Sequence, residues 1–224
     1  MKMNLIHKSI AAVAFLIIGQ EVVAQKNISE GLIKYSISIE SSKTDAPLAN
    51  KLNGATFNVY LTPTESRTEM ISTLGTETNV YNNNSGKGFI LKEYSGQKLM
   101  ITLNKENWLQ KNEWNNNLKF TISNEVKSIA GYECKKATGI TSEGKMITVY
   151  YAPGITVANK EYNNSFDNLP GLPVQFELKS GNLVFKYQLT DINNDPVAAS
   201  KFDTPKTGFR IMTYEENQQL KKGN

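Results

Sequence analysis

The chain has 224 residues, of which 25 are basic and 21 acidic, with one histidine and one cysteine. This length suits one domain with a single large core, and the modest net charge without a basic, aromatic-rich patch argues against nucleic acid as a partner. The only histidine, His7, lies in an amino-terminal targeting segment. The mature chain therefore lacks the usual proton carrier of catalytic triads and the usual ligand of histidine metal sites.

Residues 1–24 have the organisation of a secretory signal peptide. A basic head, an apolar run and a small-residue cleavage site follow one another at Lys2 and Lys8, Ile10 to Ile18, and Val22 to Ala24. A retained membrane anchor is the alternative, but the run is shorter than the ~20 apolar residues that span a bilayer. A lipid-modified terminus would need a cysteine where Gln25 stands. We expect cleavage near Ala24 and a periplasmic or secreted chain with no membrane span. It would form a single β-rich domain over residues 25–224, with 23 basic and 20 acidic residues and a net charge of +3.

From Gln25 onward, apolar and polar residues alternate in short runs, which is typical of half-buried antiparallel strands. The first strand has Ile33, Tyr35 and Ile37 on one face. A short helix is expected between residues 43 and 54, with Pro47 in its first turn and Leu48 and Leu52 on one side. Further strands are predicted at residues 55–61, 66–73, 77–81, 88–94, 98–103, 118–126, 132–140, 145–151, 174–178 and 183–189, and the tail 214–222 has helical composition. About eleven strands are too many for an ordinary flat sheet, so the chain is expected to close into a barrel, split into a β-sandwich or curl around something.

The polar segment 104–117 interrupts the strand period and carries both tryptophans, Trp108 and Trp114. With Leu109 they would form one face of a short helix that lies across an open sheet, or a lip over a cavity. Core packing is the alternative for both tryptophans.

The segment Asn168 to Pro173 predicts a rigid reversal before the last hairpin. Pro170 presets the backbone angle of the second turn position, and Gly171 would supply the positive φ of a type II turn. Pro173 cannot donate to a ladder and should open the next strand. The turn would either shape the rim of a pocket or act only as a connection that sets the register of the hairpin.

Other candidate sites have simpler interpretations. The segment 85–88 lacks the upstream glycine and the serine or threonine of a phosphate loop, and the spacing of Asp191, Asn193 and Asp195 lacks the glycine and glutamate of a calcium loop. Glu65 and Glu69 are expected to be charges on a solvated strand face, and Cys134 a small buried hydrophobe. No metal site, cofactor or catalytic residue is assigned.

Three segments carry a family resemblance: Ile129 to Ala137 (IAGYECKKA), Val149 to Pro153 (VYYAP) and Asn168 to Pro173 (NLPGLP). They resemble the GLPGLI family of small secreted bacterial proteins, which is named for its Gly-Leu-Pro-Gly-Leu-Ile turn. Here Asn168 stands for the first glycine and Pro173 for the isoleucine, and the match covers about residues 118–215. The motif residues are Gly131, Tyr132, Cys134, Leu169, Pro170, Gly171 and Leu172.

The resemblance implies no activity, because the family has none established. It looks related to periplasmic lipoprotein carriers, which implies a curved antiparallel half-barrel whose concave face is covered by one or two short helices. A carrier or binding module for an acyl chain, a lipoprotein or an apolar peptide follows as the expected function, with Trp108, Trp114, Leu169 and Leu172 as candidate ligand contacts. The alternative is an envelope interaction or assembly factor without a small ligand. An enzyme using Glu65, Glu69 or Glu133 ranks third.

Overall fold

The computed structural model describes residues 26–41, 47–113, 118–141 and 144–222. The predicted signal peptide, residues 1–24, and Trp114 lie outside the described residues. No helix within the described ranges is long and apolar enough to cross a membrane.

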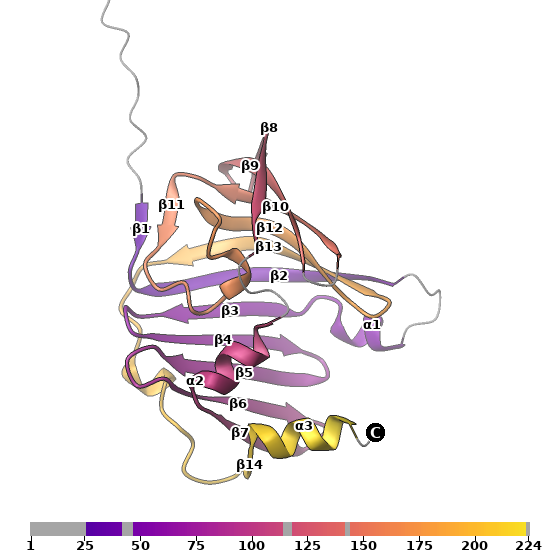
Figure 1. The fold of residues 1–224 in the computed structure, drawn as a ribbon, viewed down its shortest axis with the longest axis vertical. Coiled ribbons are helices and arrows are strands. Elements are labelled where there is room, and N and C mark those ends of the chain that lie inside the picture. The colour runs from indigo at the N-terminus through magenta and orange to yellow at the C-terminus, as the bar shows by residue number, and fades with distance from the viewer. Residues whose placement is uncertain (1–25, 42–46, 114–117, 142–143, 223–224) are drawn as a thin grey trace, which may run out of the picture.

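The described chain forms one open sheet of twelve strands in the order β14-β7-β6-β5-β4-β3-β2-β13-β12-β10-β9-β8, and its neighbours are antiparallel except for β14 and β7. Figure 1 shows β8 to β10 running across the direction of β3 to β6. The strands of this sheet are β2 Gly31–Ser41, β3 Thr56–Leu61, β4 Glu65–Ser72, β5 Gly75–Asn82, β6 Lys87–Tyr94, β7 Gln97–Leu103, β8 Phe120–Ile129, β9 Tyr132–Ile140, β10 Met146–Ala152, β12 Leu172–Ser180, β13 Leu183–Asn193 and β14 Arg210–Thr213. Strands β1 Lys26–Ile28 and β11 Ile155–Val157 pair in parallel as a separate small sheet.

The large sheet consists of two meanders that meet in its middle. Strands β2 to β7 are neighbours in chain order, as are β8 to β10, β12 and β13. The two groups join where β13 pairs with β2, for example Leu189 opposite Tyr35 and Tyr187 opposite Ile37. The predicted antiparallel sheet is confirmed. The sandwich alternative is wrong, because hydrogen bonds between neighbouring strands join all twelve into one sheet.

Side chains divide this sheet into two faces, because successive residues of a strand point in opposite directions. The inner face carries the main core, around the buried residues Ile33, Tyr35, Val59 and Phe176. A smaller cluster on the outer face, around Val80, Phe89, Leu91 and Met100, is covered by Phe202 from the segment between β13 and β14.

Three short helices accompany the sheet: α1 Pro47–Leu52, α2 Lys105–Lys111 and α3 Tyr214–Lys222. Helices α2 and α3 lie over the inner face beside β6 and β7 (Figure 1). Helix α1 begins at Pro47 as predicted, but Leu48 is 51% exposed and Ala49 is the buried residue. Leu109, predicted to share a face with Trp108, is also exposed, because a helix this short buries only a narrow stripe.

Candidate functional site

Two cavities lie on the inner side of the molecule, one at the Asn168 to Pro173 segment and one over the sheet. The turn pocket has a volume of about 150 Å³ and is lined by Thr156, Val157, Lys160, Tyr162, Asn163, Phe166 and the segment 169–173. The inner cleft has a volume of about 800 Å³ and is lined by Phe57, Met70, Glu77, Asn79, Lys111, Lys145, Tyr187, Phe185 and the segment 178–181.

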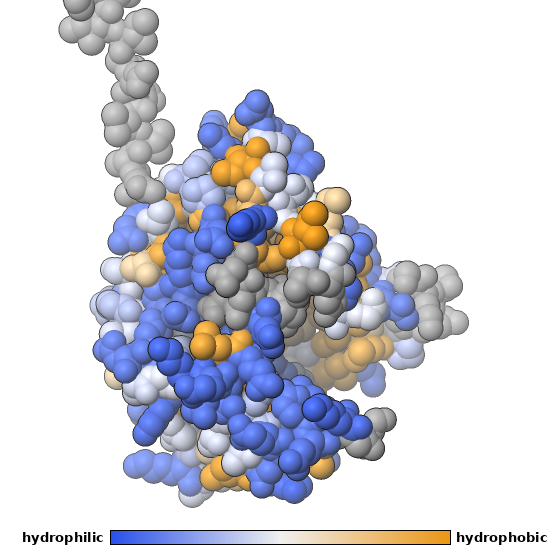
Figure 2. Space-filling model, viewed as in Figure 1, coloured by the Kyte–Doolittle hydropathy of each residue, from blue (hydrophilic) through white to orange (hydrophobic). Residues whose placement is uncertain are grey.

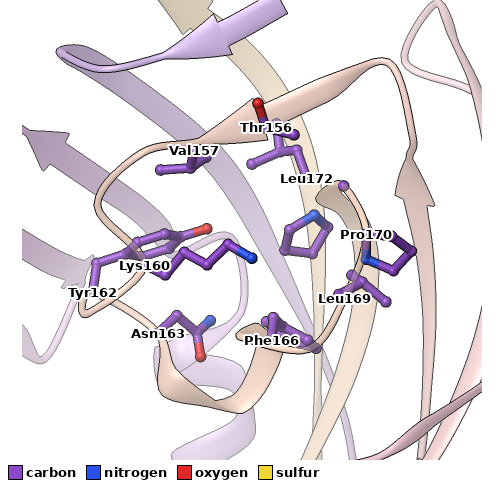
Figure 3. Close-up of a pocket in the computed structure, with 11 residues that line it drawn as sticks. Thr156, Val157, Lys160, Tyr162, Asn163, Phe166, Leu169, Pro170 and Leu172 are labelled. Carbon is purple, nitrogen blue, oxygen red and sulfur yellow. The ribbon is translucent and has the colours of Figure 1, made fainter. Parts of the chain in front are cut away.

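The turn pocket holds two of the predicted ligand contacts, Leu169 and Leu172. Figure 3 shows Lys160 and Tyr162 on one side of it and Leu169 with Pro170 on the other. Leu169 and Leu172 are 2% and 1% exposed, so nearly all of their surface already contacts protein. A volume of about 150 Å³ is also well below the roughly 300–1,000 Å³ of ordinary ligand pockets. The geometry favours the interpretation of this segment as a structural connection.

The backbone conformation of Gly171 shows that the type II turn predicted for this segment is wrong. Its φ lies outside the left-handed region, unlike that of Gly131, where φ is +81°. A Cβ atom on Gly171 would instead lie 2.3 Å from the backbone oxygen of Ala152. Glycine is needed here because the backbone of β10 passes too close for a side chain. Pro173 is the second residue of β12, opposite a β-bulge at Tyr150 and Tyr151, where its missing donor is tolerated.

Buried tyrosines fix the far end of the segment. The Tyr35 hydroxyl donates to the backbone oxygen of Pro173 at 2.9 Å, and burial raises the pKa of Tyr35 and of Tyr162, which interact with each other. Burial, with repulsion from Glu161, raises the pKa of nearby Asp167 to about 6. The hydroxyl of Tyr35 thus ties β12 to β2 across the core.

The inner cleft is a larger and more open space. Its apolar lining comes from both meanders: Phe57 and Met70 from β3 and β4, and Leu178, Phe185 and Tyr187 from β12 and β13. Facing pairs across the ladders place these side chains on one surface, with Phe57 opposite Met70 and Leu178 opposite Phe185. Figure 2 shows the surface hollowed to the right of α2, with hydrophobic surface beside the hollow.

Charged groups stand at one end of this apolar lining. The Glu77 carboxylate forms an ion pair with the Lys92 ammonium at 3.6 Å and accepts a hydrogen bond from the Tyr94 hydroxyl at 3.5 Å. Burial, with the neighbouring Glu77 carboxylate, raises the pKa of both Tyr94 and Tyr187 to about 12. Burial lowers the pKa of Lys111, which ends α2. Positive and negative groups therefore meet at the α2 end of the cleft.

Trp108 is the buried residue of α2 that packs on the sheet, and it does not line the cleft. Its ring stacks on Tyr81 of β5, with centroids 4.4 Å apart and planes 3° apart, and the residue is 3% exposed. The Lys111 ammonium lies 5.4 Å from the centroid of the same ring. Trp108 thus fixes the position of α2, which carries Lys111. Trp108 does not line a cavity together with the other predicted ligand contacts, Leu169 and Leu172.

The remaining candidates have structural surroundings. Cys134 is fully buried, as predicted, and burial raises the pKa of its thiol. Glu69 is only 7% exposed and its carboxylate binds the Arg67 guanidinium at 2.6 Å, so the expected solvated position is wrong for this residue. Glu65 accepts a hydrogen bond from Asn82, and Glu133 is exposed. Asp195 donates its backbone N–H to the side-chain oxygen of Asn193, the last residue of β13, at 2.7 Å. The described residues include no cluster suited to a metal ion.

No family model matches the chain, and no curated protein matches its sequence. Solved structures match it at low identity and with TM-scores below 0.5. PNGF-II matches with a TM-score of 0.47 and 11% identity over 85% of this chain and 33% of its own, so this chain spans about one third of that protein. An uncharacterized conserved protein from Thermus thermophilus matches with a TM-score of 0.48 and 9% identity over 82% of this chain and 91% of its own. LprF from Mycobacterium bovis matches with a TM-score of 0.34 and 10% identity over 75% of this chain and 88% of its own.

The residues of the inner cleft were not among the predicted ligand contacts. Each belongs to a predicted strand or to the segment after it, and Phe57 lies in the strand predicted at residues 55–61. The missing information was the pairing of β2 with β13. This pairing brings β3, which carries Phe57, close to β13, which carries Tyr187, so that the two rings are in contact. An alternating pattern predicts which residues of one strand share a face, but it does not predict which distant strand pairs with it.

Proposed function

We propose that this chain is a non-enzymatic binding module of the bacterial envelope that holds an apolar ligand, such as an acyl chain, in the inner cleft. The observation that carries the proposal is the open hollow of about 800 Å³ on the inner face, whose floor is formed by apolar side chains from both meanders. That volume falls within the range of ligand pockets. A ligand would cover the cleft between α2 and the β12–β13 hairpin.

The chemistry around the cleft supports binding over catalysis. An effective general base has a pKa near the working pH, whereas Tyr94 and Tyr187 have pKa values raised to about 12 and stay protonated at neutral pH. Glu77 is already engaged by Lys92 and Tyr94. The predicted mature chain contains no histidine. These groups are suited to orient a ligand and poorly suited to move its protons.

The envelope location rests on the predicted signal peptide at residues 1–24, and membership of the GLPGLI family stays a prediction. The other expected role, docking of an envelope protein without a small ligand, would use a free edge of the sheet. Strand β8 is such an edge, and its Ile122 and Val126 are exposed.

Native mass spectrometry of residues 25–224, purified from an exporting host, tests the proposal, followed by titration with dodecanoate and dodecanol. We expect co-purified lipid or saturable binding of both probes. Phe185→Glu places a charge in the cleft and should weaken binding of dodecanol at least about tenfold, or ~1.4 kcal/mol. Val184→Glu is the matched control, because Val184 is the adjacent residue of β13 and faces the opposite side of the sheet.

Thermal unfolding of both variants would separate lost binding from lost folding. An empty protein that ignores both probes would overturn the proposal and leave the docking role of β8 as the better hypothesis. Equal binding by the two variants would show that the probes bind elsewhere.

A further inference from the structure

The lining of the inner cleft is apolar along its floor and positively charged in balance. Its ionisable side chains include the ammonium groups of Lys111 and Lys145 and one carboxylate, from Glu77. Lys179 also borders the cleft, but it pairs with Val184, so its side chain is directed to the other side of the sheet. The carboxylate is shared with Lys92 and Tyr94. A purely apolar guest would bring no negative charge to the Lys111 ammonium.

Lys111 is the best placed of them for recognition. It is the last residue of α2, where the helix dipole favours a positive charge, and its ammonium rests 5.4 Å from the centroid of the Trp108 ring. Trp108 is itself held by stacking on Tyr81, so the base of the Lys111 side chain is attached to a fixed support. The position of the ammonium group is therefore largely preorganised.

The electrostatic neighbours of Lys111 leave its charge incompletely balanced. Glu77 attracts it, whereas Lys92 and Lys221 repel it, and burial is the largest influence on the group and lowers its pKa. No ion pair of Lys111 is found among the described residues. An anionic group placed beside it would replace the hydration that burial removes and would form a charge-assisted hydrogen bond.

We propose that the ligand of the inner cleft is a single-chain anionic amphiphile, whose hydrocarbon chain lies over Phe57, Met70 and Phe185 and whose head group pairs with the Lys111 ammonium. This inference rests on the proposed function, because it assigns the chemical class of the guest. The floor provides apolar surface from both meanders, and the charged end lies at α2. Lys145 also lines the cleft.

Three probes with the same twelve-carbon chain test the head group: dodecanoate, dodecanol and dodecyltrimethylammonium. The two ionic probes are titrated below their micelle concentrations and dodecanol below its solubility limit. The native chain should bind dodecanoate at least about tenfold more tightly than dodecanol, which corresponds to ~1.4 kcal/mol, and should bind the cation most weakly. Lys111→Met keeps the aliphatic stem and removes the charge, so the ratio of the dodecanoate affinity to the dodecanol affinity should fall to about one. Lys111→Arg should keep most of the preference.

Lys206→Met is the matched control, because it removes the same charge from an exposed residue that does not line the cleft. It should keep the full preference for dodecanoate. Equal binding of dodecanoate and dodecanol by the native chain, or an unchanged preference in Lys111→Met, would overturn this inference while leaving an apolar binding module intact. Failure of all three probes to bind would overturn the proposed function as well.

Discussion

At the scale of single residues, two glycines of the segments that resemble the GLPGLI family are required for different physical reasons. Gly171 has an ordinary φ but no room, because a Cβ atom would lie 2.3 Å from the backbone oxygen of Ala152. Gly131 has open space around it but a φ of +81°, which asparagine tolerates better than most residues. One substitution can therefore distinguish crowding from backbone conformation.

We predict that Gly171→Asn destabilises the domain by about 1–3 kcal/mol or more, since β10 and β12 must separate to admit a side chain. Gly131→Asn should cost less than about 1 kcal/mol, because its backbone conformation remains accessible. Urea denaturation of both variants measures the two free energies of unfolding. Similar losses at both positions would contradict the assignment of crowding to Gly171.

The sequence was sufficient to identify Gly171 as a constrained residue but not to identify the constraint. A Pro-Gly pair predicts a turn from local chemistry alone. The atom that excludes a side chain belongs to Ala152, which is distant in sequence and arrives only through the pairing of β10 with β12. Cys134 was predicted correctly because burial of a lone cysteine needs no knowledge of its partners.

At the scale of elements, α2 connects the Trp108 stack to the cleft and depends on its amino-terminal cap. The Asn104 side chain accepts the backbone N–H of Asn107 at 2.8 Å, and the Asn107 side chain accepts that of Asn104 at 3.2 Å. Asn107 also donates to the Glu215 carboxylate of α3 at 2.7 Å. The capping box therefore fixes α2 and links it to α3.

We predict that Asn104→Ala destabilises the protein by about 1 kcal/mol, while Asn104→Ser, which keeps a capping oxygen, recovers most of the loss. Hydrogen exchange should quicken in α2 more than in the central strands, because a helix of this length has little stability of its own. If α2 presents Lys111 to the ligand, the loss of the cap in Asn104→Ala should also weaken dodecanoate binding. Unchanged exchange in α2 of Asn104→Ala would contradict this role of the cap.

Elements with a clear alternating period were predictable, and very short ones were not. Strands β2 to β10, β12 and β13 follow the predicted segments closely. Strands β1 and β11 have three residues each and β14 has four, too few to establish a period of two. They form through parallel pairing with distant strands, which local sequence does not encode.

At the scale of the whole molecule, the cleft depends on the seam between the two meanders. Its apolar lining combines residues 57–70 with residues 178–187, and Phe57 packs edge-on against Tyr187 with centroids 5.6 Å apart. The sequence predicted both sets of strands and an apolar face. It did not predict the pairing of β2 with β13, because many distant strand pairings are compatible with the same alternating pattern. The existence of an inner face was therefore predictable, and the position of the cleft on it was not.

The seam also predicts how the molecule unfolds. Strands β2 and β13 pair along nearly their whole length, and one core cluster includes Ile33 and Val59 from the first meander with Ile147 and Val149 from the second. Neither meander can lose its packing without exposing the apolar surface of the other. We therefore predict a single cooperative transition for residues 25–224, although the sheet contains two groups of consecutive strands.

Ile147→Ala in a Trp114→Phe background measures this coupling. Ile147 lies in β10 and is 4% exposed, so the substitution should cost about 2–5 kcal/mol. Trp108, the remaining tryptophan, reports on the other meander through its stack on Tyr81. The urea midpoint of Trp108 fluorescence should fall by the same amount as that of far-ultraviolet circular dichroism. A fluorescence midpoint that stays in place while part of the dichroism transition moves would mean that the two meanders unfold independently, and that a ligand in the cleft bridges two units instead of occupying one.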